Sequence, residues 1–208
     1  MIILFDLDGT LIDSTEAILE SFSIAFETFN TPKPSNEEIK KLIGEPLDVM
    51  FMRLGVKEAQ KYVDAYKQHY RKISTQKTKL LPFAKEAIIK ATKIAKLGIV
   101  TTKTARYSKE LMEYFEVMQY FDVLIGREDV DNPKPHPEPI LKALKKLNYQ
   151  NHKVYMIGDT CLDCMSAKNA NVNSIGVHSG YGDLKDLNNC CEIVLPNSLK
   201  AVEWIEEN

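Results

Sequence analysis

A series of short apolar runs restricts the fold of this chain more than any other feature. Most of the runs are rich in Ile and Val, and helix-like stretches separate them from about residue 83 onward. Strands that alternate with helices are typical of βαβ units and a parallel sheet. The runs are continuous rather than alternating, which indicates strands that are buried on both faces. The expected strands are Ile2–Phe5, Gly98–Val100, Val123–Ile125, Val154–Ile157, Ser174–Val177 and Ile193–Leu195.

The stretch from about residue 15 to residue 80 has a different pattern. Apolar residues recur there at helical spacing, and no strand-like run interrupts them. Ser35 and Glu38 form a capping-box pair at the start of one of the expected helices. We therefore expect an all-helical insert at residues 15–80, and an α/β core made of residues 1–14 and 81–208.

The composition is that of a folded globular protein, because 44% of the 208 residues are hydrophobic and 27 Lys and Arg balance 29 Asp and Glu. The formal net charge of −2 gives no bulk positive field that would attract a nucleic acid or an acidic membrane. No apolar run is long enough to span a bilayer, and the run before Asp6 is too short for a signal peptide. We expect a cytoplasmic protein that binds neither nucleic acid nor membrane, and the sequence implies no partner protein.

Four cysteines form two close pairs, Cys161 with Cys164 and Cys190 with Cys191. In a chain without an export signal, this usage indicates reduced thiols rather than a disulfide framework. A zinc site is disfavoured because the second pair is adjacent, whereas structural zinc sites use spaced pairs.

Two aspartates directly follow the first expected strand, in the segment Asp6-Leu-Asp8-Gly9-Thr. Residues two apart in an extended chain point the same way, so both carboxylates would project from the carboxyl end of the strand into one small volume. Ligands of open α/β sheets bind at that edge, and Gly9 permits a sharp turn just after the pair. The alternative is a solvated Asp-rich turn. A calcium loop of the EF-hand type does not fit the positions of Gly and Glu.

A second acidic segment runs from Gly158 to Asp163, after the expected strand Val154–Ile157. Asp159 stands where that strand ends, and Asp163 lies one helical turn further on. An acid at the start of a helix is equally suited to capping it. Taken together with the first acidic pair, three clustered oxygen ligands favour a hard cation, of which Mg²⁺ is the usual one.

Two further segments carry hydroxyl groups and a cation. Thr101 and Thr102 follow an expected strand, where hydroxyl and N–H groups are suited to holding an anion. Lys134 stands in the Pro-rich segment Asn132–Pro139, and the prolines would fix its position for a phosphate. Taken alone, an exposed Lys in a Pro-rich linker is the simpler interpretation.

The four segments together resemble those of the haloacid dehalogenase superfamily of phosphotransferases. The family pattern is a DxDGT strand end, a Thr or Ser after the second strand, a Lys in a KPxP loop and a GDxxxD segment, and all four occur here in that order. The segments Phe5–Ser14 and Lys134–Pro139 are similar to the phosphoglycolate phosphatase-like branch. The resemblance implies a Rossmann-like parallel-sheet core with an inserted all-helical cap domain of the C1 type.

The resemblance also implies roles for the acidic residues. Asp6 is then the nucleophile that forms an aspartyl-phosphate, and Asp8 is the general acid and later the general base. Asp6 and Asp159 hold Mg²⁺ together with the backbone carbonyl of Asp8. The supporting residues are Asp163, Gly9 and Thr10.

The phosphate-binding residues implied by the resemblance are Thr101, the N–H of Thr102, and Lys134. Members of the family differ from one another at two of these positions. Asp8 is present, whereas members that use haloacids lack it, so dehalogenation is not expected. Thr102 stands where many relatives carry Asn, which leaves donation by its backbone N–H intact and leaves the side-chain contact open.

The function implied is magnesium-dependent hydrolysis of a small phosphate monoester, with a phosphorylated metabolite as the partner. Three alternatives stay open: a pyrophosphatase, a sugar-phosphate mutase, and a non-catalytic phosphate-binding regulatory protein, against which the intact residue set argues. The cap should close over the core site and exclude bulk water. All four chemical segments lie outside residues 15–80, so we expect the cap loop to select the substrate through Gly44, Glu45 and Pro46.

Overall fold

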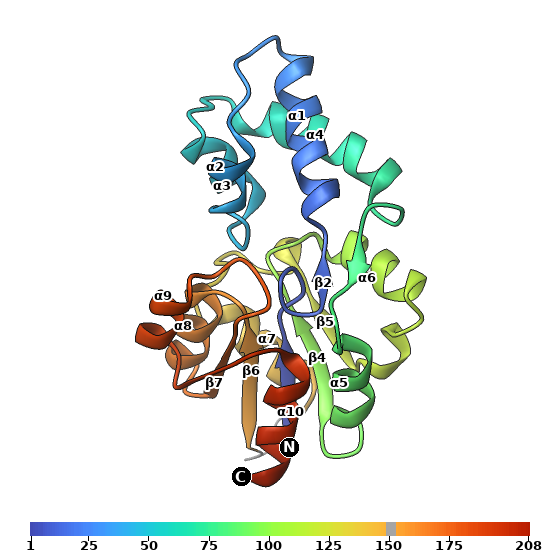
Figure 1. Cartoon of the computed structure of the whole chain (residues 1–208), viewed down its shortest axis with the longest axis vertical. Coiled ribbons are helices and arrows are strands. Elements are labelled where there is room, and N and C mark those ends of the chain that lie inside the picture. The colour runs from blue at the N-terminus through green and yellow to red at the C-terminus, as the bar shows by residue number, and fades with distance from the viewer. Residues whose placement is uncertain (149–152) are drawn as a thin grey trace.

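The computed structural model describes residues 1–148 and 153–208, and its main body is a six-stranded sheet in the order β5-β4-β1-β6-β7-β8 (Figure 1). All neighbouring strands of this sheet pair in parallel. The strands are β1 (Ile2–Phe5), β4 (Lys96–Val100), β5 (Val123–Ile125), β6 (Val154–Gly158), β7 (Asn173–Val177) and β8 (Ile193–Leu195). Each expected strand is present, so the α/β fold with a parallel sheet predicted from the sequence is confirmed.

Helices cover both faces of the sheet, which explains the continuous apolar runs. The helices of this part are α5 (Ala84–Ala91), α6 (Ala105–Tyr114), α7 (Glu138–Lys146), α8 (Cys161–Asn169), α9 (Leu184–Cys190) and α10 (Ser198–Glu207). In β1, Ile3 and Phe5 pack in one core cluster with α5, α6 and α10, while Ile2 and Leu4 pack in another with α7 and α8. A strand that is buried on both sides has no polar face, so its residues need not alternate.

Four helices form a separate unit beyond the carboxyl edge of the sheet (Figure 1). They are α1 (Thr15–Thr28), α2 (Asn36–Lys40), α3 (Leu47–Arg53) and α4 (Ala59–Ile73). The expected capping box of Ser35 and Glu38 begins α2. This helical unit has its own aromatic core, in which the rings of Phe22 and Phe51 lie 4.6 Å apart and those of Phe22 and Tyr66 lie 5.2 Å apart.

The helical unit joins the sheet domain at one short two-stranded ladder. The strands β2 (Ile12–Asp13) and β3 (Lys79–Leu80) pair in antiparallel fashion where the chain leaves the core and returns to it. The sequence pattern missed both strands because two residues each are too few to show a periodicity. Among the described residues, no helix has the length and apolar character needed to cross a bilayer.

Two disulfides join α8 to the end of α9, Cys161–Cys190 and Cys164–Cys191, with Cα–Cα distances of 5.7 and 5.1 Å. The expectation of reduced thiols is therefore wrong for this structure. That expectation rested on the missing export signal, which says nothing about distances. One helical turn separates the first two cysteines, and the fold sets each of them opposite one of the adjacent pair.

Candidate active site

The ends of β1 and β6 bring together the aspartates that follow them. The two strands are neighbours in the sheet; Asp6 follows the last residue of β1, and Asp159 follows the last residue of β6. Carboxylate oxygens of Asp6, Asp159 and Asp163 lie within 4.8 Å of one another, and all three residues are buried. An acidic cluster, defined by these three residues, therefore lies at the carboxyl edge of the sheet.

The Asp8 carboxylate lies outside the acidic cluster and lines a cavity instead. The chain leaves β1 after Phe5, so the strand alternation does not extend to Asp8. One carboxylate oxygen accepts a hydrogen bond from the Ser14 hydroxyl, and the other lies 3.1 Å from Lys103 Nζ. These two contacts fix the Asp8 carboxylate in the cavity wall.

The turn after Asp8 packs directly on Asp159. Gly9 has a φ of +81°, and a Cβ atom there would lie 2.2 Å from Asp159 Oδ2, so both the conformation and the space require glycine. The Thr10 hydroxyl donates to Asp159 Oδ1 at 3.2 Å, and the Tyr181 N–H donates to Asp159 Oδ2 at 2.8 Å. These contacts fix the orientation of the Asp159 carboxylate.

Lys134 is buried beside the acidic cluster. Its Nζ lies 2.8 Å from Asp6 Oδ1 and 2.5 Å from Asp163 Oδ1, and it donates to the Val100 carbonyl at 3.2 Å. Asp163 also accepts hydrogen bonds from the backbone N–H and hydroxyl of Thr160 at the start of α8. The Pro-rich loop thus places the Lys134 ammonium group beside Asp6. Lys134 is therefore not the exposed linker residue of the simpler interpretation.

The acidic cluster holds more negative charge than Lys134 offsets. Burial raises the pKa of Asp6 to about 7, with the charge of Asp163 adding to the effect and Lys134 opposing it. Burial, together with the charges of Asp6 and Asp163, also raises the pKa of Asp159 well above its usual range. Burial disfavours the charged lysine, but Asp163 and Asp6 prevail and raise the pKa of Lys134. One permanent cation therefore faces three carboxylates.

These residues fit a divalent cation. The donor set consists of oxygen atoms alone, which suits Mg²⁺ better than a soft transition metal. The excess negative charge gives a second cation a favourable place, because buried like charges repel strongly unless they are protonated or compensated.

The two threonines after β4 differ in their surroundings. Thr101 is buried, and its hydroxyl accepts the N–H of Lys103 at 3.1 Å while its own N–H donates to the Ile125 carbonyl at 3.0 Å. The Thr102 hydroxyl donates to the Gly44 carbonyl at 2.9 Å. Thr102 therefore connects the sheet domain to the cap loop through its side chain.

Lys103 is a site residue that the sequence analysis missed. Its Nζ lies 3.1 Å from Asp8 and 4.6 Å from the centre of the Tyr70 ring, and its side chain is only 10% exposed. Burial opposes its charged form, but Asp8 prevails and raises the pKa of Lys103 well above its usual range. The sequence signal for Lys103 was its position directly after two threonines at a strand end. Its contact with Tyr70 could not be predicted, because that ring belongs to the helical unit.

A cavity of about 480 Å³ lies between the helical unit and the sheet domain. Asp8, Thr102 and Lys103 line it from the sheet domain. Gly44, Glu45 and Tyr66 are among the lining residues from the helical unit. The volume lies within the range of small-molecule sites, which is roughly 300–1,000 Å³.

The cap loop has three residues with separate roles. Gly44 has a φ of +107°, and it meets Thr102 as described above. Glu45 forms an ion pair of 2.8 Å with Arg53, and its side chain is 17% exposed. Pro46 caps the start of α3 and is not among the residues that line the cavity, in contrast to Gly44 and Glu45.

Comparisons with known proteins identify the family that the chain matches. The family profile for haloacid dehalogenase-like hydrolases matches residues 3–177, which include all the acidic residues of the site. A protein named pyrophosphatase PpaX from Halalkalibacterium halodurans is 35% identical over 185 residues, which cover 86% of this chain and 83% of that protein. A second, from Oceanobacillus iheyensis, is 33% identical over 187 residues, with coverages of 89% and 86%.

Two solved structures extend the similarity over almost the whole chain. A haloacid dehalogenase-like family hydrolase from Streptococcus pneumoniae has a TM-score of 0.88 at 25% identity and covers 98% of this chain and 97% of that one. A "predicted phosphatase" from Clostridium acetobutylicum has a TM-score of 0.91 at 27% identity, with coverages of 100% and 98%.

Proposed function

The chain belongs to the haloacid dehalogenase-like hydrolase family, and from this premise we propose that it is a magnesium-dependent phosphohydrolase that cleaves inorganic pyrophosphate through an aspartyl-phosphate on Asp6. The observation that carries the choice of substrate is a pair of lysines, the buried Lys134 beside Asp6 and Lys103, whose side chain is 10% exposed, beside Asp8. Pyrophosphate has two phosphoryl groups, and each lysine would face one of them. The names of the curated relatives support the same substrate.

The first step is an attack by Asp6 on phosphorus. The bond between phosphorus and the bridging oxygen breaks, and its electron pair goes to the leaving phosphate. Asp8 lines the cavity; it enters this step in its protonated form, gives its proton to that leaving oxygen, and is left as the carboxylate that pairs with Lys103. Lys103, 3.1 Å from Asp8, offsets the charge of the leaving phosphate.

The transferred phosphoryl group would lie over Asp6. Lys134, the Thr101 hydroxyl and the Thr102 N–H would face its oxygens. In the second step Asp8, now ionised, takes a proton from water, which attacks phosphorus and releases Asp6. Bound Mg²⁺, held by Asp6, Asp159 and the Asp8 carbonyl, would supply positive charge next to the phosphoryl oxygens.

A phosphate monoester is the second candidate substrate, and the size of the cavity favours it. About 480 Å³ is ample for an organic leaving group, and Tyr66 and Ile18 are among the residues that line the cavity. The same chemistry at Asp6 and Asp8 would serve both substrates, so the two differ only in what occupies the cavity.

The test is the release of phosphate from pyrophosphate and from a panel of monoesters, in magnesium and in excess chelator. We expect a higher kcat/KM for pyrophosphate than for the esters, loss of turnover in chelator and recovery with Mg²⁺. Calcium should support less turnover, because it takes more ligands at longer distances. Turnover of esters without turnover of pyrophosphate would leave the monoester as the substrate, and full turnover in chelator would exclude the metal role.

A further inference from the structure

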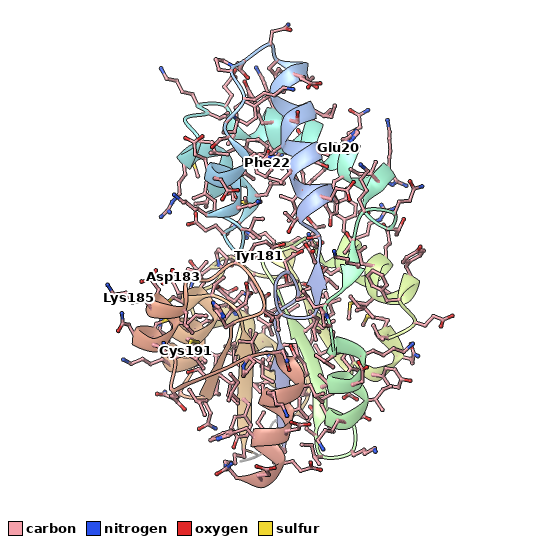
Figure 2. All side chains as sticks on the ribbon, in the orientation of Figure 1. Glu20, Phe22, Tyr181, Asp183, Lys185 and Cys191 are labelled. Atoms are coloured by element: carbon pink, nitrogen blue, oxygen red, sulfur yellow. A yellow bond between two sulfur atoms is a disulfide. The ribbon has the colours of Figure 1, made fainter. Side chains whose placement is uncertain are left out.

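The four cysteines form one sulfur cluster that ties α8 to α9. Cys161 and Cys164 lie one helical turn apart at the start of α8, and Cys190 and Cys191 stand at the end of α9. The two bridges are close together, because the Sγ atoms of Cys190 and Cys191 lie 3.8 Å apart. Cys191 lies among the helices beside the sheet in Figure 2. Two cross-links therefore fix the end of α9 on the first turn of the helix that follows Asp159.

Helix α9 has little other anchoring. Leu187 is its only buried residue. Its N-cap, Asp183, accepts hydrogen bonds only from the N–H groups of Lys185 and Asp186 within the same helix. The two bridges consequently provide much of the attachment of α9 to α8.

The loop between β7 and α9, residues 178–183, holds Asp159 in place. The Tyr181 N–H donates to Asp159 Oδ2 at 2.8 Å. The backbone of Gly180 and Gly182 is so close that Cβ atoms there would lie 2.1 Å from Asp159 Oδ2 and 2.0 Å from the Asp159 carbonyl oxygen. Figure 2 shows Tyr181 where the helical unit meets the sheet domain. The loop is also held by the Ser179 hydroxyl, which donates to the Gly9 carbonyl at 3.0 Å, and by the Tyr181 hydroxyl, which lies 2.9 Å from the Thr15 hydroxyl. A change at α9 would reach the acidic cluster through the six residues of this loop.

We propose that the two bridges are a reversible thiol–disulfide site, which in its oxidised form holds loop 178–183 against Asp159 and is opened by a dithiol reductant of the thioredoxin type. The Cys161–Cys190 bridge is attacked first, because both of its residues are partly exposed, whereas Cys164 in the other bridge is 1% exposed. The loosening of loop 178–183 on reduction does not depend on which reaction the protein catalyses. The expected fall in turnover on reduction rests on the proposed function.

Each exchange is balanced in atoms and electrons. A thiolate of the reductant attacks one sulfur of the bridge, the S–S bond breaks, and the second cysteine leaves as a thiolate that takes a proton from solvent. The second thiol of the reductant then displaces the first cysteine from the mixed disulfide. Each bridge gains two electrons and two protons, and the reductant becomes a disulfide. A disulfide oxidant reverses the exchange.

The test compares the full-length protein after oxidation by oxidised glutathione with the same sample after reduction by thioredoxin or dithiothreitol. Alkylation and mass measurement should count four thiols after reduction and none after oxidation. Hydrogen exchange of residues 178–183 should be faster in the reduced protein. The affinity for Mg²⁺, measured by calorimetry, should fall about 10- to 100-fold, as for the loss of a group that orients a metal ligand, and turnover at limiting Mg²⁺ should fall with it.

Cysteine variants provide the matched controls. The quadruple serine variant should behave as the reduced protein does, with or without reductant. The Cys161→Ser/Cys190→Ser variant keeps one bridge and should lie between the two states. If the quadruple variant fails to fold, the oxidised and reduced wild-type samples still decide the matter.

Three results would overturn the proposal. One is a protein in which oxidation leaves all four thiols free. Another is a zinc ion held by the four thiolates in the purified protein, which would make the cluster a metal site. The third is equal hydrogen exchange of residues 178–183 and equal Mg²⁺ affinity in the two redox states. None of these readouts requires turnover, so an error in the proposed reaction would be seen separately, as intact redox effects on the loop without hydrolysis.

Discussion

Lys103 and Asp8 form an ion pair of 3.1 Å at the boundary between the sheet domain and the cavity. The Tyr70 ring, from α4 of the helical unit, covers the ammonium group at 4.6 Å from the ring centre. A lysine held between a carboxylate and an aromatic ring has little freedom to leave its place. The pair therefore fixes a cation beside the residue that we assign as the general acid.

Replacing Lys103 should affect pyrophosphate more than a simple ester. A hydrogen bond to a charged group contributes about 1.5–3 kcal/mol, so Lys103→Met should lower kcat/KM for pyrophosphate by about 10- to 150-fold. The loss for p-nitrophenyl phosphate should be smaller, because its leaving group carries no second phosphate. The control is Lys109→Met on α6, where the lysine side chain is 61% exposed. Equal losses for both substrates would contradict the assignment of Lys103 to the leaving phosphate.

The two aspartates of the first motif should fail in different ways. Asp6→Asn removes the nucleophile and keeps its shape, so no phosphoenzyme should form in rapid acid-quench measurements with labelled substrate. Asp8→Asn should still bind substrate and metal but lose proton transfer, which is commonly worth about 10²–10⁴ in rate. Asp13→Asn, in β2 outside the acidic cluster, serves as the control. Near-normal turnover of the Asp6 variant would exclude covalent catalysis by this residue.

The sequence predicted those parts of the site that depend on strand ends. Asp6 and Asp159 could be placed together because buried Ile- and Val-rich runs precede both and parallel strands end at a common edge. Lys103 was missed because its partner Tyr70 belongs to the helical unit, and no periodicity reports which helix faces which loop. The cysteine pairing was missed for a similar reason.

The metal-free protein should lose stability as the pH rises. The folded state releases the Asp6 proton at a pKa of about 7, whereas the ordinary value for the unfolded chain is 3.8. Between these values the folded state binds more protons than the unfolded state, so the free energy of unfolding falls by about 1.4 kcal/mol per pH unit for a fully protonated group. The raised pKa of Asp159 acts in the same direction. The stabilisation is complete below pH 3.8 and is lost as the pH rises through about 7.

Thermal unfolding in chelator checks this linkage. The Tm should fall between pH 5 and pH 8, and Mg²⁺ should restore it at pH 8. Asp6→Asn should show a shallower fall and a higher Tm than the wild type at pH 8, because it carries no charge to bury. Asp64→Asn on α4, where the carboxylate is exposed, should keep the wild-type slope. A Tm that rises from pH 5 to pH 8 in chelator would show that other groups dominate.

Glu45 is the acidic residue of the cap loop and lies in the cavity wall. One carboxylate oxygen pairs with Arg53 at 2.8 Å, while the other is buried and has no hydrogen-bond partner among the described residues. Burial raises the pKa of Glu45, and Arg53 opposes this effect. A carboxylate in this place disfavours a polyanion in the cavity and leaves a neutral leaving group unaffected.

Glu45→Gln should therefore change the ranking of substrates. The repulsion between the Glu45 carboxylate and pyrophosphate should amount to about 0.5–1 kcal/mol, so its removal should lower the KM for pyrophosphate about two- to fivefold. The KM for p-nitrophenyl phosphate should stay the same. Steady-state kinetics on a panel of esters with leaving groups of different charge would measure the effect. Glu37→Gln on α2, where the side chain is 74% exposed, controls for the change in net charge of the helical unit. If Glu45→Gln changes all substrates equally, the cap loop does not select the substrate, and selection has to come from the sheet-domain side of the cavity, where Asp8, Lys103, Arg127 and Glu128 are the charged lining residues.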